Sequence, residues 1–135
     1  STYGAYNRVY QNRKPSLSCK QEADSYTVSS DTGNGKLTYP VGLLTIDEAS
    51  MAGGLYNSVN TQYYLYTGQT YWTMSPSNFY SANALASAWR VTSTGSLYAN
   101  WVSDSYGVRP VVNLSADVLI SGGDGSASNP YVVVR

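Results

Sequence analysis

The stretch 69–114 constrains the fold more than any other part of the sequence. It contains all three tryptophans and the only phenylalanine among small polar residues, and it is nearly free of charge until an Arg-Pro pair near its end. Rigid aromatic side chains give contact area at a low entropy cost, and small polar residues adapt their hydrogen bonds. The stretch therefore predicts short strands that present an uncharged contact surface.

Composition narrows the classes of protein that fit. The 135 residues are a single domain by length, and tyrosine dominates the aromatic residues, with 14 copies against three tryptophans and one phenylalanine. Because a buried tyrosine hydroxyl needs a partner, many of these rings should lie half exposed or at strand edges. Eight basic residues balance eight acidic ones, and no apolar run is long enough to span a membrane. We expect neither nucleic-acid binding nor membrane insertion by this segment.

Residues that usually carry chemistry are scarce. The sequence has no histidine, and its only cysteine is Cys19, so the commonest general base, an internal disulfide and a Cys-rich zinc site are all excluded. Without a histidine to activate it, Cys19 is predicted to be a buried small hydrophobe. Asp47 and Glu48 are adjacent, but both fall in the first turn of a predicted helix, so we interpret them as capping residues. The residues predict no catalytic set, no metal site and no cofactor.

The first part of the chain is polar and predicts short elements. The spacing of three tyrosines over residues 3–10 fits one face of a short helix. Alternating apolar residues predict strands at 15–20 and 25–29, followed by a glycine-containing turn at 29–36.

A stronger signal begins at Tyr39. A strand of about five residues precedes Thr45, and Glu48 three positions later completes a helix capping box. The glycine pair at 53–54 ends the helix after about two turns. The predicted inner face consists of Ile46, Ala49 and Ala52, with Met51 adding bulk.

Alternation in the central stretch predicts further strands. Residues 71–76 should place Trp72 and Met74 on one face and Tyr71 and Thr73 on the other, and Pro76 should end the strand. Residues 84–92 and 97–102 should form a hairpin, because the turn between them holds a glycine, Gly95, where positive φ is needed.

Residues 106–114 are the strongest predicted strand, with Val108, Val111 and Val112 building core. Arg109 stands before a proline in this otherwise apolar run. Its guanidinium should therefore be partly buried and hydrogen-bonded to backbone carbonyls or a carboxylate, which is a structural role. A loop and a terminal strand should complete the chain.

The order of several motifs resembles a known family. YWTMSP, AWRV with STGSL, YGVRPVVNL and a final NPYVV, within roughly residues 37–134, resemble the C-type-lectin-fold domains at the ends of bacterial surface and pilin-like proteins. The resemblance implies an α+β fold of the C-type lectin kind, with short antiparallel strands, one or two short helices and much irregular loop. It implies one domain over 1–135, of which 1–36 carry less of the resemblance.

Broader relatives of this fold differ in chemistry. Formylglycine-generating enzymes depend on a cysteine pair near the C-terminal end, and this chain has only Cys19, so their activity does not carry over. The variable proteins of diversity-generating retroelements are similar in another way, because their Asn positions are rewritten to Tyr, Ser, Asp, Ala or Thr on a fixed scaffold. Residues 80–106 are rich in these types. Trp89 and Trp101 would not arise from rewritten asparagine codons, so they look like scaffold residues or anchors.

The resemblance to variable proteins implies a binding face over residues 79–106. Its side chains should crowd one exposed patch that points away from a core of Val91, Leu97 and Val108. The candidate ligand-binding residues are Tyr80, Asn83, Ser87, Tyr98, Asn100, Trp101, Asp104 and Tyr106, with Trp101 as an aromatic anchor.

Calcium-dependent sugar binding, which many animal C-type lectins perform, is not expected. Residues 75–78 lack the carboxylate of the Glu-Pro-Asn motif, and 100–104 resemble the Trp-Asn-Asp motif only loosely. A hard cation needs several converging oxygens with carboxylates among them. The single aspartate of 122–126 lies between glycines and predicts a turn.

Two functions remain open. In the first, the chain is a non-enzymatic recognition module for a protein or glycan ligand, displayed outside the cell, on a cell surface or on a virion, where it can be the end of a longer exported protein. In the second, it is a structural domain that caps an exported fibre, since a row of tyrosines is more often core or interface than ligand pocket. The resemblance and the uncharged face favour recognition.

Overall fold

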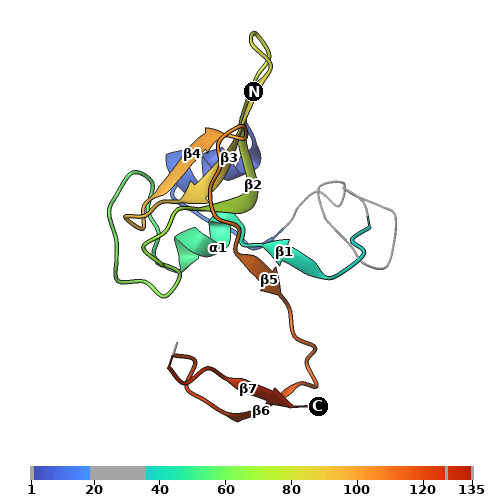
Figure 1. Ribbon diagram of the computed structural model, residues 1–135. Coiled ribbons are helices and arrows are strands. Elements are labelled where there is room, and N and C mark those ends of the chain that lie inside the picture. Colours follow the sequence, from blue (N-terminus) through green and yellow to red (C-terminus); the bar gives the residue numbers. More distant parts are fainter. Residues whose placement is uncertain (1, 19–35, 127, 135) are drawn as a thin grey trace.

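The computed structural model describes residues 2–18, 36–126 and 128–134. In these ranges the chain has two short helices and three small sheets, each with antiparallel strands (Figure 1). Few helices and mostly antiparallel strands are consistent with the expected α+β class. The elements are η1 (Tyr6–Gln11), β1 (Val41–Leu43), α1 (Ile46–Met51), β2 (Tyr71–Tyr80), β3 (Leu85–Val91), β4 (Leu97–Trp101), β5 (Pro110–Val112), β6 (Leu119–Gly122) and β7 (Val132–Val134).

The central sheet has the order β2-β3-β4, so β4 is an outer strand. β3 and β4 form the expected hairpin, and Gly95 in its turn has a φ of 76°, which a side chain would strain. β2 continues through Pro76 to Tyr80, so the prediction that Pro76 ends this strand is wrong. Its pairing with β3 is irregular on both sides of Pro76, and such an irregularity accommodates a residue that cannot donate a ladder hydrogen bond.

One face of the central sheet forms the core together with α1 and η1. Trp89, Val91 and Leu97 are fully buried, as the alternation of the predicted hairpin requires. Tyr71 and Thr73 also point inward, which confirms the predicted division of this strand into two faces. The other core hydrophobics are Ala5, Val9, Ile46, Ala49, Tyr63 and Leu65.

α1 begins at the predicted capping box. The Thr45 hydroxyl accepts a hydrogen bond from the Glu48 N–H at 3.2 Å, and the Glu48 carboxylate accepts one from the Thr45 N–H at 2.7 Å. The predicted inner face is confirmed for Ile46 and Ala49, which are fully buried. Met51 is 52% exposed and adds nothing to the core, because it stands two positions after Ala49 and so lies on the other side of the helix.

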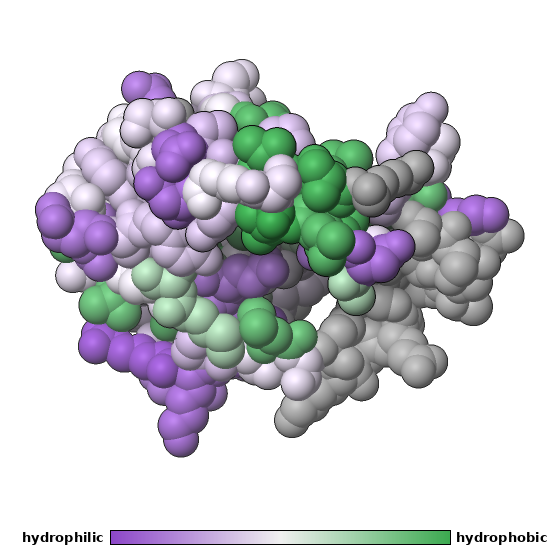
Figure 2. Space-filling view, turned by 90° about the horizontal axis from the view of Figure 1, so that it is seen from below, coloured by the Kyte–Doolittle hydropathy of each residue, from purple (hydrophilic) through white to green (hydrophobic). Residues whose placement is uncertain are grey.

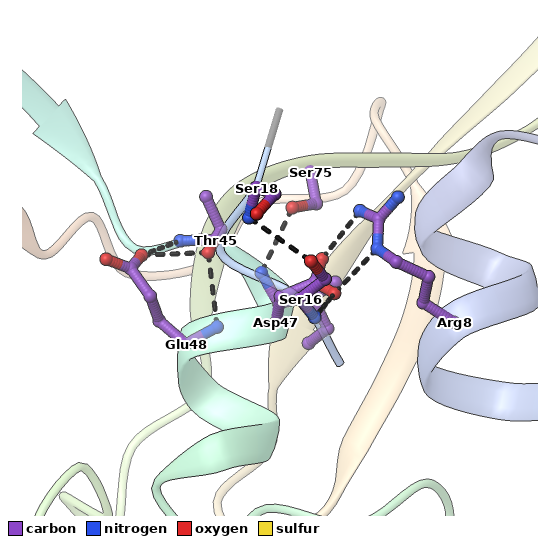
Figure 3. A network of polar contacts seen from close by, with 8 residues as sticks. Arg8, Ser16, Ser18, Thr45, Asp47, Glu48 and Ser75 are labelled. Atoms are coloured by element: carbon purple, nitrogen blue, oxygen red, sulfur yellow. Dashed lines mark hydrogen bonds and ion pairs between the residues drawn. The ribbon is translucent and has the colours of Figure 1, made fainter. Parts of the chain in front are cut away.

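Asp47 does more than the predicted capping. Its buried carboxylate accepts two hydrogen bonds from Arg8, with Nε to Oδ1 and Nη2 to Oδ2 both at 2.7 Å (Figure 3). The Ser16 N–H donates to the same Oδ1 at 2.9 Å, and the neighbouring Ile46 N–H donates to Ser75 Oγ of β2 at 3.0 Å. These bonds join η1, the segment after it, α1 and β2.

Replacing this carboxylate should therefore weaken the whole fold. We expect Asp47→Ala to lower the free energy of unfolding by about 3 kcal/mol, because buried ion pairs cost this much when one partner is removed. Arg8→Ala should cost at least as much, since it leaves a buried charge without its cation. Urea unfolding measures both, with Asp117→Ala at an exposed carboxylate as the control. Wild-type stability in Asp47→Ala would contradict this role.

The N-terminal helix lies near its predicted place but faces the core differently. η1 is a short π-helix, closed by a bond of 2.8 Å from the Asn12 N–H to the Asn7 carbonyl. Val9 is its buried residue, whereas Tyr10 is exposed. Residues 15–18 form no strand. The rest of the strand predicted at 15–20, the strand at 25–29, nearly all of the turn at 29–36 and Cys19 lie outside the described residues.

The last part of the chain departs most from prediction. The strand expected over 106–114 is limited to the three residues of β5, which pair with β1, and Val108 is 68% exposed. Val112 is exposed as well and Val111 is only half-buried, so the prediction that these valines build core is wrong. The expected terminal strand is present as β7 and pairs with β6. This β6–β7 hairpin stands apart from the central sheet (Figure 1), and the molecule seen from below shows strongly hydrophobic residues gathered at the surface (Figure 2).

Arg109 has the surroundings that its sequence context predicted. It is half-buried, its Nη1 donates to the Leu65 carbonyl at 2.9 Å, and its guanidinium lies 5.5 Å from the centre of the Tyr71 ring. The Tyr71 hydroxyl donates to the same carbonyl at 2.8 Å. These contacts hold the loop before β2 against the segment before β5.

We expect Arg109→Ala to lower the free energy of unfolding by roughly 1–2 kcal/mol, since it removes a charge-assisted hydrogen bond and a cation–π contact. Thermal melting and urea unfolding measure the loss, and Lys14→Ala at an exposed cation serves as the control. An unchanged melting temperature would exclude the structural role. Any ligand affinity should change less than stability does.

Buried tyrosines have hydroxyl partners, as composition suggested. The Tyr63 hydroxyl donates to the Gly95 carbonyl at 2.8 Å. Burial, with a smaller contribution from nearby Tyr71, raises the pKa of Tyr63 to about 12, because the charged phenolate is poorly solvated there. In the unfolded chain the pKa is about 10.

This difference makes stability depend on alkaline pH. Above about pH 10 the unfolded state loses the Tyr63 proton first, so the contribution is complete below that pH and is lost as the pH rises towards about 12. We expect Tyr63→Phe to remove roughly 2–3 kcal/mol of this alkaline loss. Urea unfolding at successive pH values measures it, with Tyr64→Phe at an exposed ring as the control. Equal alkaline losses in wild type and Tyr63→Phe would refute the assignment.

Candidate functional site

An open cavity of about 340 Å³ runs along β4. It is lined by consecutive residues of this strand, 98–101, although successive side chains of a strand point to opposite faces of the sheet. The cavity therefore reaches β4 from both sides of this strand, and it also extends over the rest of the sheet, because Ser77 of β2 and Trp89 of β3 line it as well. Its lining residues are Tyr6, Tyr56, Ser77, Asn78, Tyr80, Ser87, Trp89, Tyr98, Ala99, Asn100 and Trp101.

The cavity gathers most of the candidate residues but divides them between two faces. Ser87 pairs with Trp101 across the β3–β4 ladder, on the face that carries Trp89. Tyr98 and Asn100 alternate with Trp101 and project from the other face. The prediction of one exposed patch is thus wrong, because these residues project from two faces of the sheet and Ser87 is buried. Tyr98 is 40% exposed, so it is not part of the core.

Aromatic pairs border the cavity at both ends. At one end Tyr56 and Tyr98 stack with ring centres 5.6 Å apart and planes 10° from parallel. At the other end Tyr80 and Trp101 meet edge to face at 5.4 Å. Tyr56 also contacts the buried Trp89 edge to face at 5.9 Å, so the core holds the Tyr56 ring in place.

Tyr106 belongs to the face of the sheet that carries Tyr98. Its hydroxyl accepts a hydrogen bond from Asn100 Nδ2 at 2.7 Å, and its ring lies edge to face with Trp72 at 5.0 Å. The guanidinium of Arg90 lies 4.6 Å from the centre of the Tyr106 ring and 5.9 Å from that of Tyr98. Tyr106 therefore does not line the cavity but orients the amide of Asn100, which does.

Asn83 and Asp104 lie away from the cavity. Asn83 is exposed in the turn that joins β2 and β3, and Asp104 follows β4 with its backbone N–H bonded to the Trp101 carbonyl at 3.0 Å. Ser87 lines the cavity but is buried, and its hydroxyl accepts a bond of 3.2 Å from the Asn78 N–H. Its polar group is already used within the sheet.

The cavity is electrically neutral. None of its lining residues carries a charge, and burial, followed by neighbouring tyrosines, raises the pKa of Tyr6 and Tyr56 above the usual tyrosine value. Trp89 Nε1 is a buried donor without a hydrogen-bond partner among the described residues. The part of the chain that the structure describes contains no group of three or more histidine, cysteine, aspartate or glutamate side chains that could hold a metal ion.

Several lining residues were not among the sequence candidates. Tyr6 comes from η1, Tyr56 from the loop after α1, and Ser77 and Asn78 from β2 beyond the proline that was expected to end the strand. Their place depends on contacts distant in sequence, such as the bond of 2.9 Å from the Leu97 N–H to the Leu55 carbonyl. No local pattern could have identified them.

Comparisons with protein-family models, with curated proteins and with solved structures found no match. Within the described part of the chain, no helix has the length and hydrophobicity that a membrane crossing needs.

Proposed function

We propose that this chain is a non-enzymatic recognition module that binds its ligand in the cavity along β4. The observation that carries the proposal is an uncharged cavity of about 340 Å³ bordered by two aromatic pairs, each with one exposed ring and one half-buried ring. Ligand sites are typically about 300–1,000 Å³, mostly apolar, with a few convergent polar groups. Aromatic anchors beside adaptable amides are also the composition of recognition surfaces.

The setting that we propose follows from the motif order. The domain would have a C-type lectin fold and be displayed by a bacterial surface, pilin-like or phage protein, outside the cell or on the virion, with a protein or glycan as its ligand. Tyr80, Tyr98 and Asn100 at the cavity are residue types typical of the rewritten positions of retroelement variable proteins, and Trp101 is a fixed anchor. Neither a nucleic acid nor direct membrane insertion fits the balanced charge.

One observation favours the alternative of a structural domain that caps an exported fibre. Large apolar residues of the β6–β7 hairpin are exposed, among them Leu119, Ile120 and Val132. Exposed apolar patches of this kind often mark contacts with another protein. In this case the tyrosines would serve packing between domains, and the cavity would bind nothing.

Two substitutions test recognition. We expect Tyr98→Ala and Trp101→Ala each to weaken a ligand at least tenfold, which corresponds to about 1.4 kcal/mol, because desolvated aromatic contacts at hot spots contribute this much or more. A glycan array and a library of random linear peptides supply the probes, and calorimetry measures the affinity of those that bind. Tyr64→Ala, at an exposed ring outside the cavity, is the matched control.

Stability must be measured on the same variants. Tyr98→Ala should leave the melting temperature nearly unchanged, since this ring is 40% exposed. If Tyr98→Ala unfolds the domain, or if both variants keep wild-type affinity for every probe, the cavity is not a binding site. Chemical turnover of any bound probe would contradict the non-enzymatic part of the proposal.

A further inference from the structure

We propose that the ligand is an extended, uncharged peptide segment that adds as a strand to the free edge of β4. This inference rests on the proposed recognition function and specifies its ligand. It depends on which backbone groups of β4 are already paired.

The ladder between β3 and β4 uses every second residue of β4. The register pairs Arg90 with Tyr98 and Ala88 with Asn100. It is continued by bonds of 2.9 Å from the Thr92 N–H to the Ser96 carbonyl and of 3.1 Å from the Val102 N–H to the Ala86 carbonyl. In an antiparallel ladder, hydrogen-bonded pairs alternate with pairs that are not bonded to each other. The even-numbered residues of β4 therefore bond to β3, and the odd-numbered ones direct their backbone groups to the outer edge.

Residues 55–57 already pair with the first of these outward positions, Leu97. The Leu97 N–H donates to the Leu55 carbonyl at 2.9 Å, and the Asn57 N–H donates to the Leu97 carbonyl at 3.1 Å. The segment runs parallel to β4 at this point. It then turns away, with Asn57 at a φ of 49° and a bond of 3.4 Å from the Ser58 N–H to the Leu55 carbonyl.

Beyond Leu97, three of the outward backbone groups of β4 have no hydrogen-bond partner among the described residues. At Trp101 the carbonyl accepts from the Asp104 N–H at 3.0 Å. The N–H and carbonyl of Ala99 and the N–H of Trp101 have no hydrogen-bond partner within residues 2–18, 36–126 and 128–134. Ala99 lines the cavity between the Tyr56–Tyr98 pair and Trp101.

The spacing of these groups favours a peptide over a glycan. Donor, acceptor and donor stand along one strand edge, and another extended backbone offers the complementary groups at the same repeat. Alternate side chains of the added segment would lie beside Tyr98 on one face and beside Tyr56 on the other. Because no lining residue is charged, the side chains that enter the cavity should be neutral, and aromatic or aliphatic ones would gain most from the surrounding rings.

The first experiment follows the backbone amides of β4 by NMR hydrogen exchange. In the free protein the Tyr98 and Asn100 amides should be protected by β3, whereas the Ala99 and Trp101 amides should exchange much faster. A saturating peptide, selected on the wild-type domain from a library of random linear peptides, should slow exchange at Ala99 and Trp101 at least about tenfold. Unchanged exchange at both amides in the complex would overturn the proposal.

The second experiment removes single hydrogen bonds. Ala99→Pro removes the outward N–H and no hydrogen bond to β3, and proline is tolerated where an edge N–H faces away from the ladder, so the fold should persist while peptide affinity falls at least about tenfold. Replacing successive amides of the peptide by esters tests the same bonds without altering the domain. One or two ester positions should lose affinity comparably, and tolerance of esters at every position would overturn strand addition.

The outcomes separate this inference from recognition itself. Peptides that lose affinity when their amides are replaced by esters support both recognition and strand addition. If glycans bind in a way that depends on Trp101 and no peptide binds, recognition would stand and the proposal of a peptide ligand would be overturned. If peptides bind but tolerate an ester at every position, they bind through side chains alone. Recognition would then stand, and strand addition would be overturned. If neither library yields a ligand sensitive to Trp101→Ala, both proposals fail.

Discussion

The arrangement of the molecule depends most on the buried carboxylate of Asp47. A charge in this position would cost several kcal/mol without partners, and it is compensated by Arg8 and by the Ser16 N–H. These groups come from η1 and from the segment after it, so one side chain of α1 fixes the N-terminal part of the chain (Figure 3). Because η1 contributes Val9 to the core and Tyr6 beside Trp89, the same contact helps to close the core.

The placement of η1 also links the core of the protein to the cavity. Tyr6 and Tyr56 reach the cavity from parts of the chain that are distant in sequence from β4, and both contact the buried ring of Trp89. Rings that the core already holds lose little freedom when a ligand binds, which lowers the entropy cost of association. At the outer edge of β4, Leu97 is bonded to Leu55 and Asn57, whereas Ala99 has no backbone partner among the described residues. The path of the loop after α1 therefore decides how much of this edge is paired.

Local patterns predicted those elements whose cause is local. The capping box of Thr45 and Glu48, the turn at Gly95 and the inward face of β3 follow from hydrogen bonds or sterics within a few residues. The same patterns failed over 106–114, where a run of valines indicated a core strand. Alternation and β-branching show that a segment can form a strand, but whether another layer covers that strand depends on the rest of the chain.

The sequence by itself determined the short antiparallel strands, the capped helix, the neutrality of the surface and the residue types of the candidate site, because these depend on composition and on neighbours along the chain. Only the tertiary structure decided that Asp47 pairs with Arg8, that the candidate residues lie on two faces of the sheet, and that some of them line one cavity with residues distant in sequence. The physical reason is that the pairing of a strand edge depends on which other parts of the chain lie beside it. The pairing of Leu55 with Leu97, the first residue of β4, joins parts of the chain that are distant in sequence, so it is a property of the folded chain that no local periodicity contains.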